Sequence, residues 1–262
     1  VKGRACADGR KQRRYIAKED VTSPTVQLES LITTALIDAH EQRDVATADV
    51  TGAYLLAELE DYVVVKITGE SANIMCKMNE NYKNYLTTEK GQPVLYMRLT
   101  KALYGCMQSA ILWYTMFKEC LEQLGFKLNK YDPCVANKWV HGKQCIVCWY
   151  VDDTKISHVN ADVVSSIIQQ LESKFGRMSV TRGNKHTFVG MDLEFRSDGK
   201  LKISMPQYIE ECITAFGEDI RNKVRTPAKR DLFDIEHDDQ SKMENLDEHK
   251  SDIFHHIVAK LL

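Results

Sequence analysis

The strongest constraint on the fold is a pair of adjacent acids between two apolar stretches. Residues 145–150 and 154–158 are rich in the apolar and aromatic side chains that favour β-strands, and only Val151, Asp152 and Asp153 separate them. A connection this short joins two strands as an antiparallel hairpin. The pattern therefore predicts a hairpin with two carboxylates at its tip, although Asp is also common in turns for purely structural reasons.

A third acid occupies a similar position elsewhere in the chain. Asp49 lies near the end of an apolar stretch, residues 45–50, that leads into a helical turn. Acids at strand ends meet readily at one edge of a sheet, so we expect Asp49 to approach Asp152 and Asp153. Three carboxylates held together repel one another unless a cation lies among them. Two hard divalent ions with oxygen ligands would relieve that repulsion and create a site for phosphoryl transfer.

The rest of the chain mixes helices and strands. Apolar residues at helical spacing predict helices over 28–39, 113–124, 163–175, 206–216 and from 253 onward, with a more polar helix over 73–86. Strands are predicted over 45–50, 62–67, 145–150 and 154–158, and residues 188–195 and 201–204 are expected to form a hairpin. Because the two kinds of element do not alternate regularly, the predicted fold class is α+β.

The near-neutral net charge of −2 hides two charged segments. Residues 1–18 contain seven Lys and Arg against one Asp, which indicates either a phosphate-bearing partner or a solubilising surface. Residues 231–252 contain nine acids and two Lys, as expected for a solvated connector.

No apolar run approaches the roughly 18 residues that span a bilayer. Eight Cys without a secretory signal predict free thiols, and Cys145 and Cys148 lack the further ligands of a zinc site.

The residues around the three acids resemble one enzyme family. Residues 150–153 (Tyr-Val-Asp-Asp) between two apolar strands are similar to a motif of reverse transcriptases, and residues 49–54 resemble the first carboxylate motif of the same enzymes. Residues 101–109 and 132–134 follow in the order found in the copia-type (Pseudoviridae) long-terminal-repeat retrotransposon polyprotein. The resemblance covers about residues 2–262. It departs from the family at Met107 and Ala110, where Lys and Pro are usual, and at Asp8, where a second Arg is usual.

This resemblance implies the fold and the activity. It implies reverse-transcriptase fingers and palm with a ferredoxin-like antiparallel palm sheet over residues 1–216. Residues 217–262 would be the acidic connector and the start of a connection toward a missing ribonuclease H domain. The implied activity is RNA-directed DNA polymerase: two Mg²⁺ ions, or Mn²⁺ instead, would support the addition of deoxynucleotides to a DNA primer on an RNA template.

The implied setting is a Pol polyprotein with integrase and ribonuclease H. No membrane partner is expected. Reduced cysteines and the lack of a targeting signal indicate a cytoplasmic location, and the resemblance adds virus-like particles and nuclear access for integration.

Roles follow by resemblance for the residues of the implied active site. Asp49 and Asp152 would bridge both metal ions, Asp153 would complete the cluster, and the backbone carbonyl of Val50 would add a ligand. Tyr54 would stack beneath the sugar and exclude a ribose 2′-hydroxyl; the alternative is a tyrosine of the core.

Further residues are expected to contact the substrates. Lys2 and Arg4 would contact either the nucleotide triphosphate or the template phosphates. Tyr104 and Gln108 would shape the nucleotide or template pocket. Residues 188–194 resemble the segment that grips the primer, and the primer contacts would come from Phe188, Gly190 and Met191. Trp113 is expected in the core because of its helical spacing with apolar neighbours.

Two other functions remain open at this point. A two-metal nuclease would need an activating side chain near the acids, and only His158 is close in sequence. A domesticated or inactive retroelement fragment would bind nucleic acid without catalysis.

Overall fold

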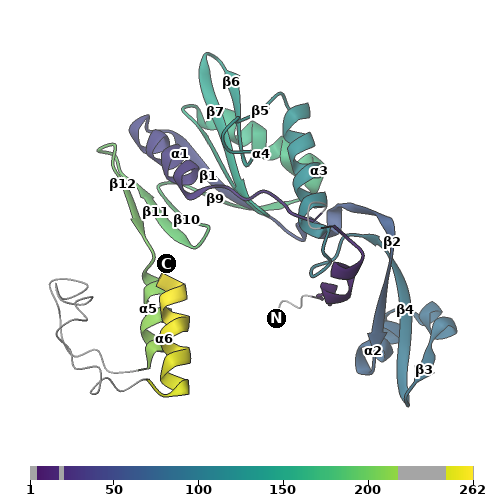
Figure 1. The fold of residues 1–262 in the computed structure, drawn as a ribbon. Helices are drawn as coiled ribbons and strands as arrows, with labels where there is room; N and C mark the ends of the chain where they lie inside the picture. Colours follow the sequence, from purple (N-terminus) through teal and green to yellow (C-terminus); the bar gives the residue numbers. More distant parts are fainter. Residues whose placement is uncertain (1–4, 18–20, 218–245, 262) are drawn as a thin grey trace. The chain divides into compact units, whose positions relative to one another are not determined.

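The computed structural model describes residues 5–17, 21–217 and 246–261, and the chain forms two compact units, Val1–Ile203 and Ser204–Leu262. The first unit contains a six-stranded sheet in the order β5-β6-β7-β8-β1-β9, with every pair antiparallel (Figure 1). Its strands are β1 (Asp44–Val50), β5 (Lys127–Leu128), β6 (Val135–Val140), β7 (Lys143–Tyr150), β8 (Asp153–His158) and β9 (Met178–Arg182). Helices packed on this sheet and the antiparallel pairing confirm the predicted α+β class.

The two faces of this sheet differ in chemistry. One face is apolar: alternate residues of β1 and β7 pack with helices α3 (Ser109–Gln123) and α4 (Ala161–Phe175) in the main core. The opposite face meets helix α1 (Leu28–His40) and carries a buried polar network, in which Asp38 of α1 contacts Lys155 and Ser157 of β8. Side chains alternate between faces along a strand, so Asp153 shares the polar face with Lys155.

A separate three-stranded sheet, in the order β2-β4-β3, follows β1 in the chain. Its strands are β2 (Glu58–Thr68), β3 (Thr87–Glu89) and β4 (Gln92–Lys101). One face packs on helix α2 (Glu70–Met78), where Ala72 and Cys76 are buried against Leu95. The predicted helix over 73–86 is wrong in its length, because α2 ends at Met78. The short 3-10 helix η3 (Glu80–Tyr85) follows, and the Asn79 side chain caps its N-terminus.

The segment predicted as one strand over 188–195 is two strands. β10 (Lys185–Phe188) and β11 (Met191–Phe195) form a hairpin, and β12 (Leu201–Ser204) completes a three-stranded sheet in the order β10-β11-β12. Val189 and Gly190 form the turn with φ values of 50° and 74°. Positive φ at both central residues is the geometry of a type I′ hairpin turn, which short-range hydrophobic pattern alone did not reveal.

The second unit contains α5 (Pro206–Phe216) and α6 (Glu248–Leu261), which lie side by side (Figure 1). Pro206 begins α5, as expected for a residue that needs no intrahelical amide donor there. The Tyr208 hydroxyl donates to the Lys260 carbonyl and ties the two helices together. In the part of the chain that the structure describes, no helix is long and apolar enough to cross a membrane. The functional boundary predicted between residues 216 and 217 stays a prediction.

Candidate active site

The fold places Asp49 and Asp153 directly opposite each other. They are cross-strand partners at the end of the β1–β8 pair, and partners in an antiparallel ladder share a face. Asp152 lies in the two-residue turn between β7 and β8, and the Val50 amide donates to the Asp152 carbonyl at 3.4 Å. All three acids are half-buried. The structure thus brings the predicted acids to one edge of the sheet.

The charges of these acids affect one another. The pKa of Asp153 is raised, first by partial burial and then by the negative charges of Asp152 and Asp49. A carboxylate that loses water and faces two like charges is stabilised by a proton or by a cation. The electrostatics of this edge therefore favour a bound positive charge.

The donor set fits a hard divalent ion in its chemistry. Three carboxylates at one sheet edge, beside the backbone of Val50, are the oxygen ligands that Mg²⁺ and Mn²⁺ prefer. As the side chains of the described residues stand, no group of three His, Cys, Asp or Glu is gathered closely enough to hold an ion. Binding would therefore have to draw the three carboxylates together.

Tyr54 and Tyr104 meet beside this edge. Gly52 has a φ of 71°, a left-handed conformation that Gly adopts at little cost, and it turns the chain from β1 into the short 3-10 helix η2 (Ala53–Leu56). This turn brings the Tyr54 ring to 4.8 Å from the Tyr104 ring, measured between centroids. Tyr54, expected beneath the sugar, and Tyr104, expected at the nucleotide or template pocket, are 50 residues apart in the chain and are therefore neighbours in the fold.

Gln108 lies in the loop between Tyr104 and helix α3. Its side-chain Nε2 donates to Asp61 Oδ2 at 2.5 Å, which links this loop to strand β2. The Gln108 Oε1 atom is buried and, among the described residues, has no hydrogen-bond partner. A buried acceptor without a donor is unfavourable, so this oxygen is suited to accept a hydrogen bond from a ligand.

The N-terminal segment is hydrogen-bonded to the same loop. The Ala7 amide donates to the Tyr104 carbonyl at 2.7 Å, and the Met107 amide donates to Gln12 Oε1 at 3.0 Å. Gly9 and Gly105 allow this crossing: a Cβ on Gly9 would lie 2.2 Å from the Gly105 carbonyl oxygen. The predicted phosphate ligands Lys2 and Arg4 lie outside the described residues.

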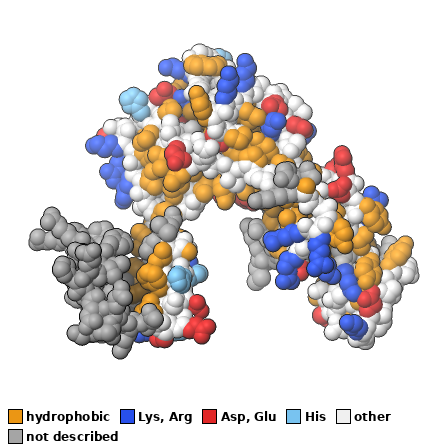
Figure 2. Space-filling view, in the orientation of Figure 1, with side chains coloured by type: hydrophobic (Ala, Val, Ile, Leu, Met, Phe, Trp, Pro, Cys, Tyr) orange, Lys and Arg blue, Asp and Glu red, His pale blue; other side chains and the backbone are white. Residues whose placement is uncertain are grey.

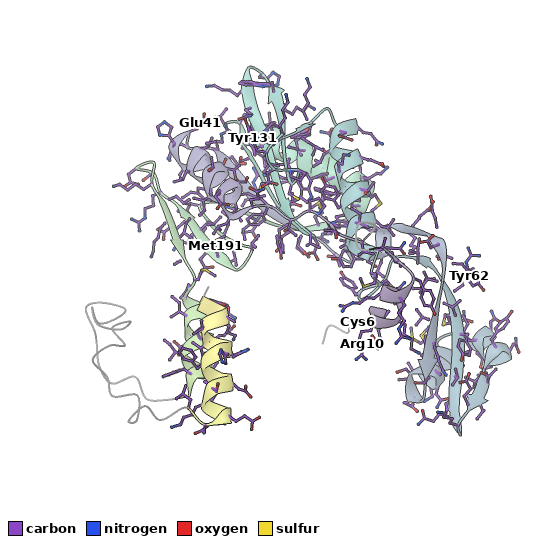
Figure 3. All side chains as sticks on the ribbon, in the orientation of Figure 1. Cys6, Arg10, Glu41, Tyr62, Tyr131 and Met191 are labelled. Atoms are coloured by element: carbon purple, nitrogen blue, oxygen red, sulfur yellow. The ribbon has the colours of Figure 1, made fainter. Side chains whose placement is uncertain are left out.

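The described part of this segment is strongly basic. The 3-10 helix η1 (Gly9–Arg14) exposes Arg10, Lys11, Arg13 and Arg14. Figure 3 labels Arg10 on this segment, and Figure 2 shows Lys and Arg side chains gathered in the same area of the view. Arg10 is engaged by Asp8, whose pKa it lowers to about 2. The other cations of η1 form no ion pair with the described residues, so they are available to a phosphate-bearing partner.

The three predicted primer contacts lie together in the β10–β11 hairpin. Phe188 ends β10, Met191 begins β11 opposite it, and Gly190 is in the turn between them (Figure 3). Both side chains are buried, with exposures of 2% for Phe188 and 8% for Met191. A contact to a nucleic acid would therefore have to come from the backbone of the turn.

Sequence reasoning missed three residues that support this site. Gln12 and Asp61 hold the loop that carries Tyr104 and Gln108, and Trp113 donates from Nε1 to the Val151 carbonyl at 2.7 Å. Trp113 is in the core, as its helical spacing predicted. Its hydrogen bond to the acidic turn could not be foreseen, because it joins residues 38 positions apart.

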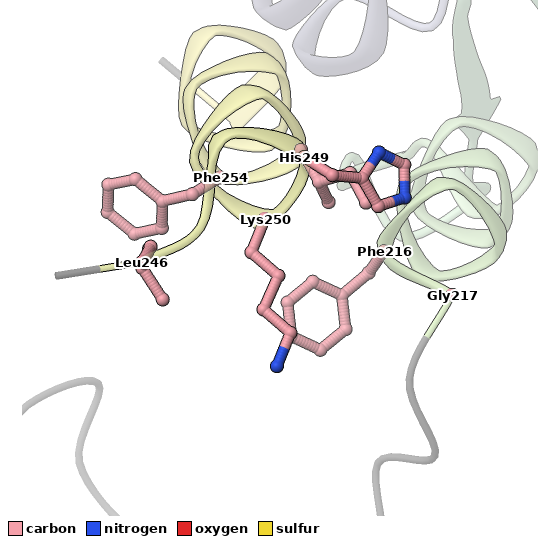
Figure 4. Close-up of a pocket in the computed structure, with 7 residues that line it drawn as sticks. Phe216, Gly217, Leu246, His249, Lys250 and Phe254 are labelled. Atoms are coloured by element: carbon pink, nitrogen blue, oxygen red, sulfur yellow. The ribbon is translucent and has the colours of Figure 1, made fainter. Parts of the chain in front are cut away.

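A cavity of about 410 Å³ lies between α5 and α6 in the second unit (Figure 4). Phe216, Leu246, Ile253 and Phe254 give it an apolar lining, and His249 and Lys250 add polar atoms. None of the predicted site residues contributes to it.

All eight cysteines are free thiols, as predicted, and burial raises the pKa of Cys145 to about 12.

Comparison with known proteins agrees with this geometry. The family described as reverse transcriptase (RNA-dependent DNA polymerase) matches residues 1–230. The retrovirus-related Pol polyprotein from transposon TNT 1-94 of Nicotiana tabacum is 25% identical over 228 residues, which cover 86% of this chain and 16% of that protein. The transposon Ty1-DR4 Gag-Pol polyprotein of Saccharomyces cerevisiae is 22% identical over 275 residues, which cover 97% of this chain and 15% of that protein. The chain thus spans about one sixth of the length of these relatives.

Solved structures show weaker likenesses. Apo telomerase from Candida tropicalis, truncated from its C-terminal domain, has a TM-score of 0.40 at 15% identity over 70% of this chain and 41% of that one. The foamy viral protease-reverse transcriptase in complex with double-stranded DNA has a TM-score of 0.36 at 11% identity over 65% of this chain and 24% of that one. The family match covers most of the chain and includes the residues that form the acidic edge. The chain therefore belongs to the reverse transcriptase (RNA-dependent DNA polymerase) family and is related to the copia-type retrotransposon Pol polyproteins.

Proposed function

We propose that the chain is an RNA-directed DNA polymerase that adds deoxynucleotides to a primer, as part of a retrotransposon Pol polyprotein. The observation that carries this proposal is the pairing of Asp49 with Asp153 across β1 and β8, with Asp152 in the adjoining turn. Phosphoryl transfer needs negative charge to be neutralised and reactants to be aligned, and a group of acids that holds divalent ions does both.

In this proposal the six-stranded sheet is the palm, with a ferredoxin-like core, and the β2-β4-β3 sheet belongs to the fingers. The antiparallel pairing and the two helices on the apolar face of the larger sheet support the first assignment. Residues 1–216 would then form fingers and palm, and residues 217–262 the acidic connector toward a ribonuclease H domain of the polyprotein.

Asp49, Asp152 and Asp153 would hold two Mg²⁺ ions, or Mn²⁺ ions, with help from the Val50 carbonyl. When bound, such ions activate the primer 3′-hydroxyl and neutralise the leaving pyrophosphate. The chain's own contribution is to fix the carboxylates: β1 and β8 set the separation of Asp49 and Asp153, and the turn sets Asp152. The raised pKa of Asp153 supports this assignment, because a cation would relieve the repulsion that raises it.

The aromatic pair would bind the incoming nucleotide. Tyr54, whose ring packs at a tilt against that of Tyr104, would fill the space of a ribose 2′-hydroxyl and so select deoxynucleotides. Gln108 would accept a hydrogen bond through its buried Oε1 atom while Asp61 fixes its amide nitrogen. Fixed donors and acceptors lower the entropy cost of aligning the substrate.

The basic N-terminal segment would bind phosphates. Lys2 and Arg4 are proposed for the triphosphate, and Lys11, Arg13 and Arg14 of η1 for the template strand. The hydrogen bonds between this segment and the Tyr104 loop support both proposals, because they hold the segment that carries these cations beside the proposed nucleotide pocket. Guanidinium and ammonium groups are the usual partners of phosphate oxygens.

The β10–β11 turn would contact the primer. The buried side chains of Phe188 and Met191 would pack beneath the turn and hold it in place, and the backbone of Gly190 would approach the primer strand.

The partners in this proposal are an RNA template, a DNA primer, deoxynucleoside triphosphates, and the integrase and ribonuclease H of the polyprotein. The proposed setting is the cytoplasm, within virus-like particles, with nuclear access for integration.

The geometry does not favour the nuclease alternative. His158 is at the far end of β8 from Asp153, about 17 Å away at the usual rise per residue, and its Nδ1 accepts from the Asn160 amide. An inactive nucleic-acid-binding fragment would retain the basic segment without needing the acids.

Primer extension on an RNA template tests the proposal. The wild-type chain should extend a DNA primer with Mg²⁺ or Mn²⁺, and Asp152→Asn should abolish extension without changing the circular dichroism spectrum. Asp198→Asn, an exposed acid in the loop between β11 and β12, is the matched control and should extend normally. An Asp152→Asn variant that extends primers at the wild-type rate would show that the acids do not serve polymerisation.

A further inference from the structure

The turn that carries Asp152 has an unfavourable backbone conformation. Val151 and Asp152 connect β7 to β8, and Val151 has a φ of 56°. Two-residue hairpins need positive φ at the first central residue, a place where Gly is preferred. A β-branched residue in this region is uncommon and persists only when its surroundings hold it there.

Trp113 supplies such a restraint from helix α3. Its indole Nε1 donates to the Val151 carbonyl at 2.7 Å, and only 1% of the residue is exposed. The rings of Phe117 and Phe175 pack against the indole, with ring centroids 5.5 and 5.2 Å away, and against each other. Packing therefore fixes the direction in which the Trp113 indole donates, and the hydrogen bond in turn fixes the orientation of the Val151 carbonyl.

The position of this carbonyl bears directly on the acids. The Val151 carbonyl belongs to the peptide group that leads into Asp152, so its orientation sets where Asp152 leaves the turn. The link from Asp152 to β1, in which Val50 donates to the Asp152 carbonyl, is long at 3.4 Å. The shorter bond from Trp113 is thus the firmer of these two restraints on the turn.

We propose that Trp113 is a positioning residue that holds the Val151–Asp152 turn in its strained form and so fixes Asp152 beside Asp49 and Asp153. The proposal rests on the polymerase function proposed above. Without the indole donor, Val151 would relax toward negative φ, the peptide group would rotate, and Asp152 would lose its alignment. Trp113 acts through the turn and touches no substrate.

Trp113→Phe is the test, because Phe keeps an aromatic ring against Phe117 and Phe175 but has no hydrogen-bond donor. In steady-state primer extension we expect kcat to fall by roughly ten- to a hundred-fold, with KM for deoxynucleotides nearly unchanged. Trp149→Phe is the control: Trp149 is buried in the same core, with its ring centroid 5.4 Å from that of Phe117, and its indole is not hydrogen-bonded to the described residues of the turn. An equal loss of kcat in both variants would overturn the proposal, since it would indicate a general effect of core packing.

Val151→Gly separates a role through the turn from a role in the core. Gly adopts positive φ without a restraint, so the loss caused by Trp113→Phe should be much smaller in a Val151→Gly background. An equal loss in both backgrounds would show that Trp113 does not act through the conformation of residue 151.

Amide hydrogen exchange provides a readout that does not depend on activity. The amides of Asp152 and Asp153 should exchange faster in Trp113→Phe than in Trp149→Phe, while the amides of β6 should be the same in both. If the wild-type chain extends no primer, the polymerase proposal fails but the restraint is still confirmed by this pattern. Unchanged exchange at the turn in Trp113→Phe would overturn the restraint whatever the activity.

Discussion

Lys155→Met should strongly destabilise the first unit. Lys155 lies on β8 two residues after Asp153, and its side chain is completely buried with that of Asp38 on helix α1. Its ammonium group donates to Asp38 Oδ2, and Ser157 Oγ donates to Asp38 Oδ1 at 2.5 Å. Met replaces the aliphatic stem with a side chain of similar volume, so the substitution removes the charge and leaves the packing largely intact.

The magnitude follows from the charge that remains. Removing one partner of a buried ion pair costs about 3–5 kcal/mol, because the other charge stays buried without compensation. Arg43 Nη1 lies 3.9 Å from Asp38 Oδ1 and compensates part of that charge, so we expect a loss near the lower limit, about 3 kcal/mol. That is a large fraction of a typical unfolding free energy of about 5–15 kcal/mol.

Urea unfolding measures this loss. With a denaturant slope of about 3 kcal/mol per M, the midpoint should fall by about 1 M. Lys143→Met, which removes an exposed cation from β7, should be nearly neutral. A loss below about 1 kcal/mol in Lys155→Met would refute the reasoning, since the remaining charge would have to be well solvated.

The other predictions concern catalysis, selectivity and binding. Asp49→Asn should abolish primer extension yet hold or raise the unfolding free energy near neutral pH, because it removes one of the negative charges that raise the pKa of Asp153 in the folded state. This gain in unfolding free energy should vanish at low pH, where the acids become protonated. Urea unfolding at two pH values measures the difference. Tyr54→Val should raise ribonucleotide incorporation more than deoxynucleotide incorporation, and an unchanged preference in competition assays would make Tyr54 an ordinary core residue. Arg13→Ala with Arg14→Ala should weaken template binding and reduce the slope of log K against log salt by about 0.7–0.9 for each lost contact, measured by fluorescence anisotropy. A salt slope equal to that of the wild type would leave these two cations as a solubilising surface.

Local pattern was sufficient for several elements that bury one face in a core. The alternation and helical spacing of apolar residues predicted α1, α4, β1 and the β7–β8 hairpin close to their observed bounds. Pattern failed where local turn chemistry or distant pairing decides the structure. β10 and β11 were read as one strand because Val189 is an unusual residue at a positive φ, and β4, β6 and β9 were not predicted.

The sequence by itself determined the chemical parts of this protein: the fold class, the family, the hairpin with Asp152 and Asp153 at its tip, and Asp49 at the end of another strand. These depend on residue type and short spacing, which the chain displays directly. Only the tertiary structure decided that Asp49 and Asp153 are cross-strand partners, that the Tyr54 ring contacts the Tyr104 ring, and that Trp113 donates a hydrogen bond to the acidic turn. Each of these contacts joins residues far apart in the chain, so it exists only after the sheet has set its strand order and the helices have packed against it.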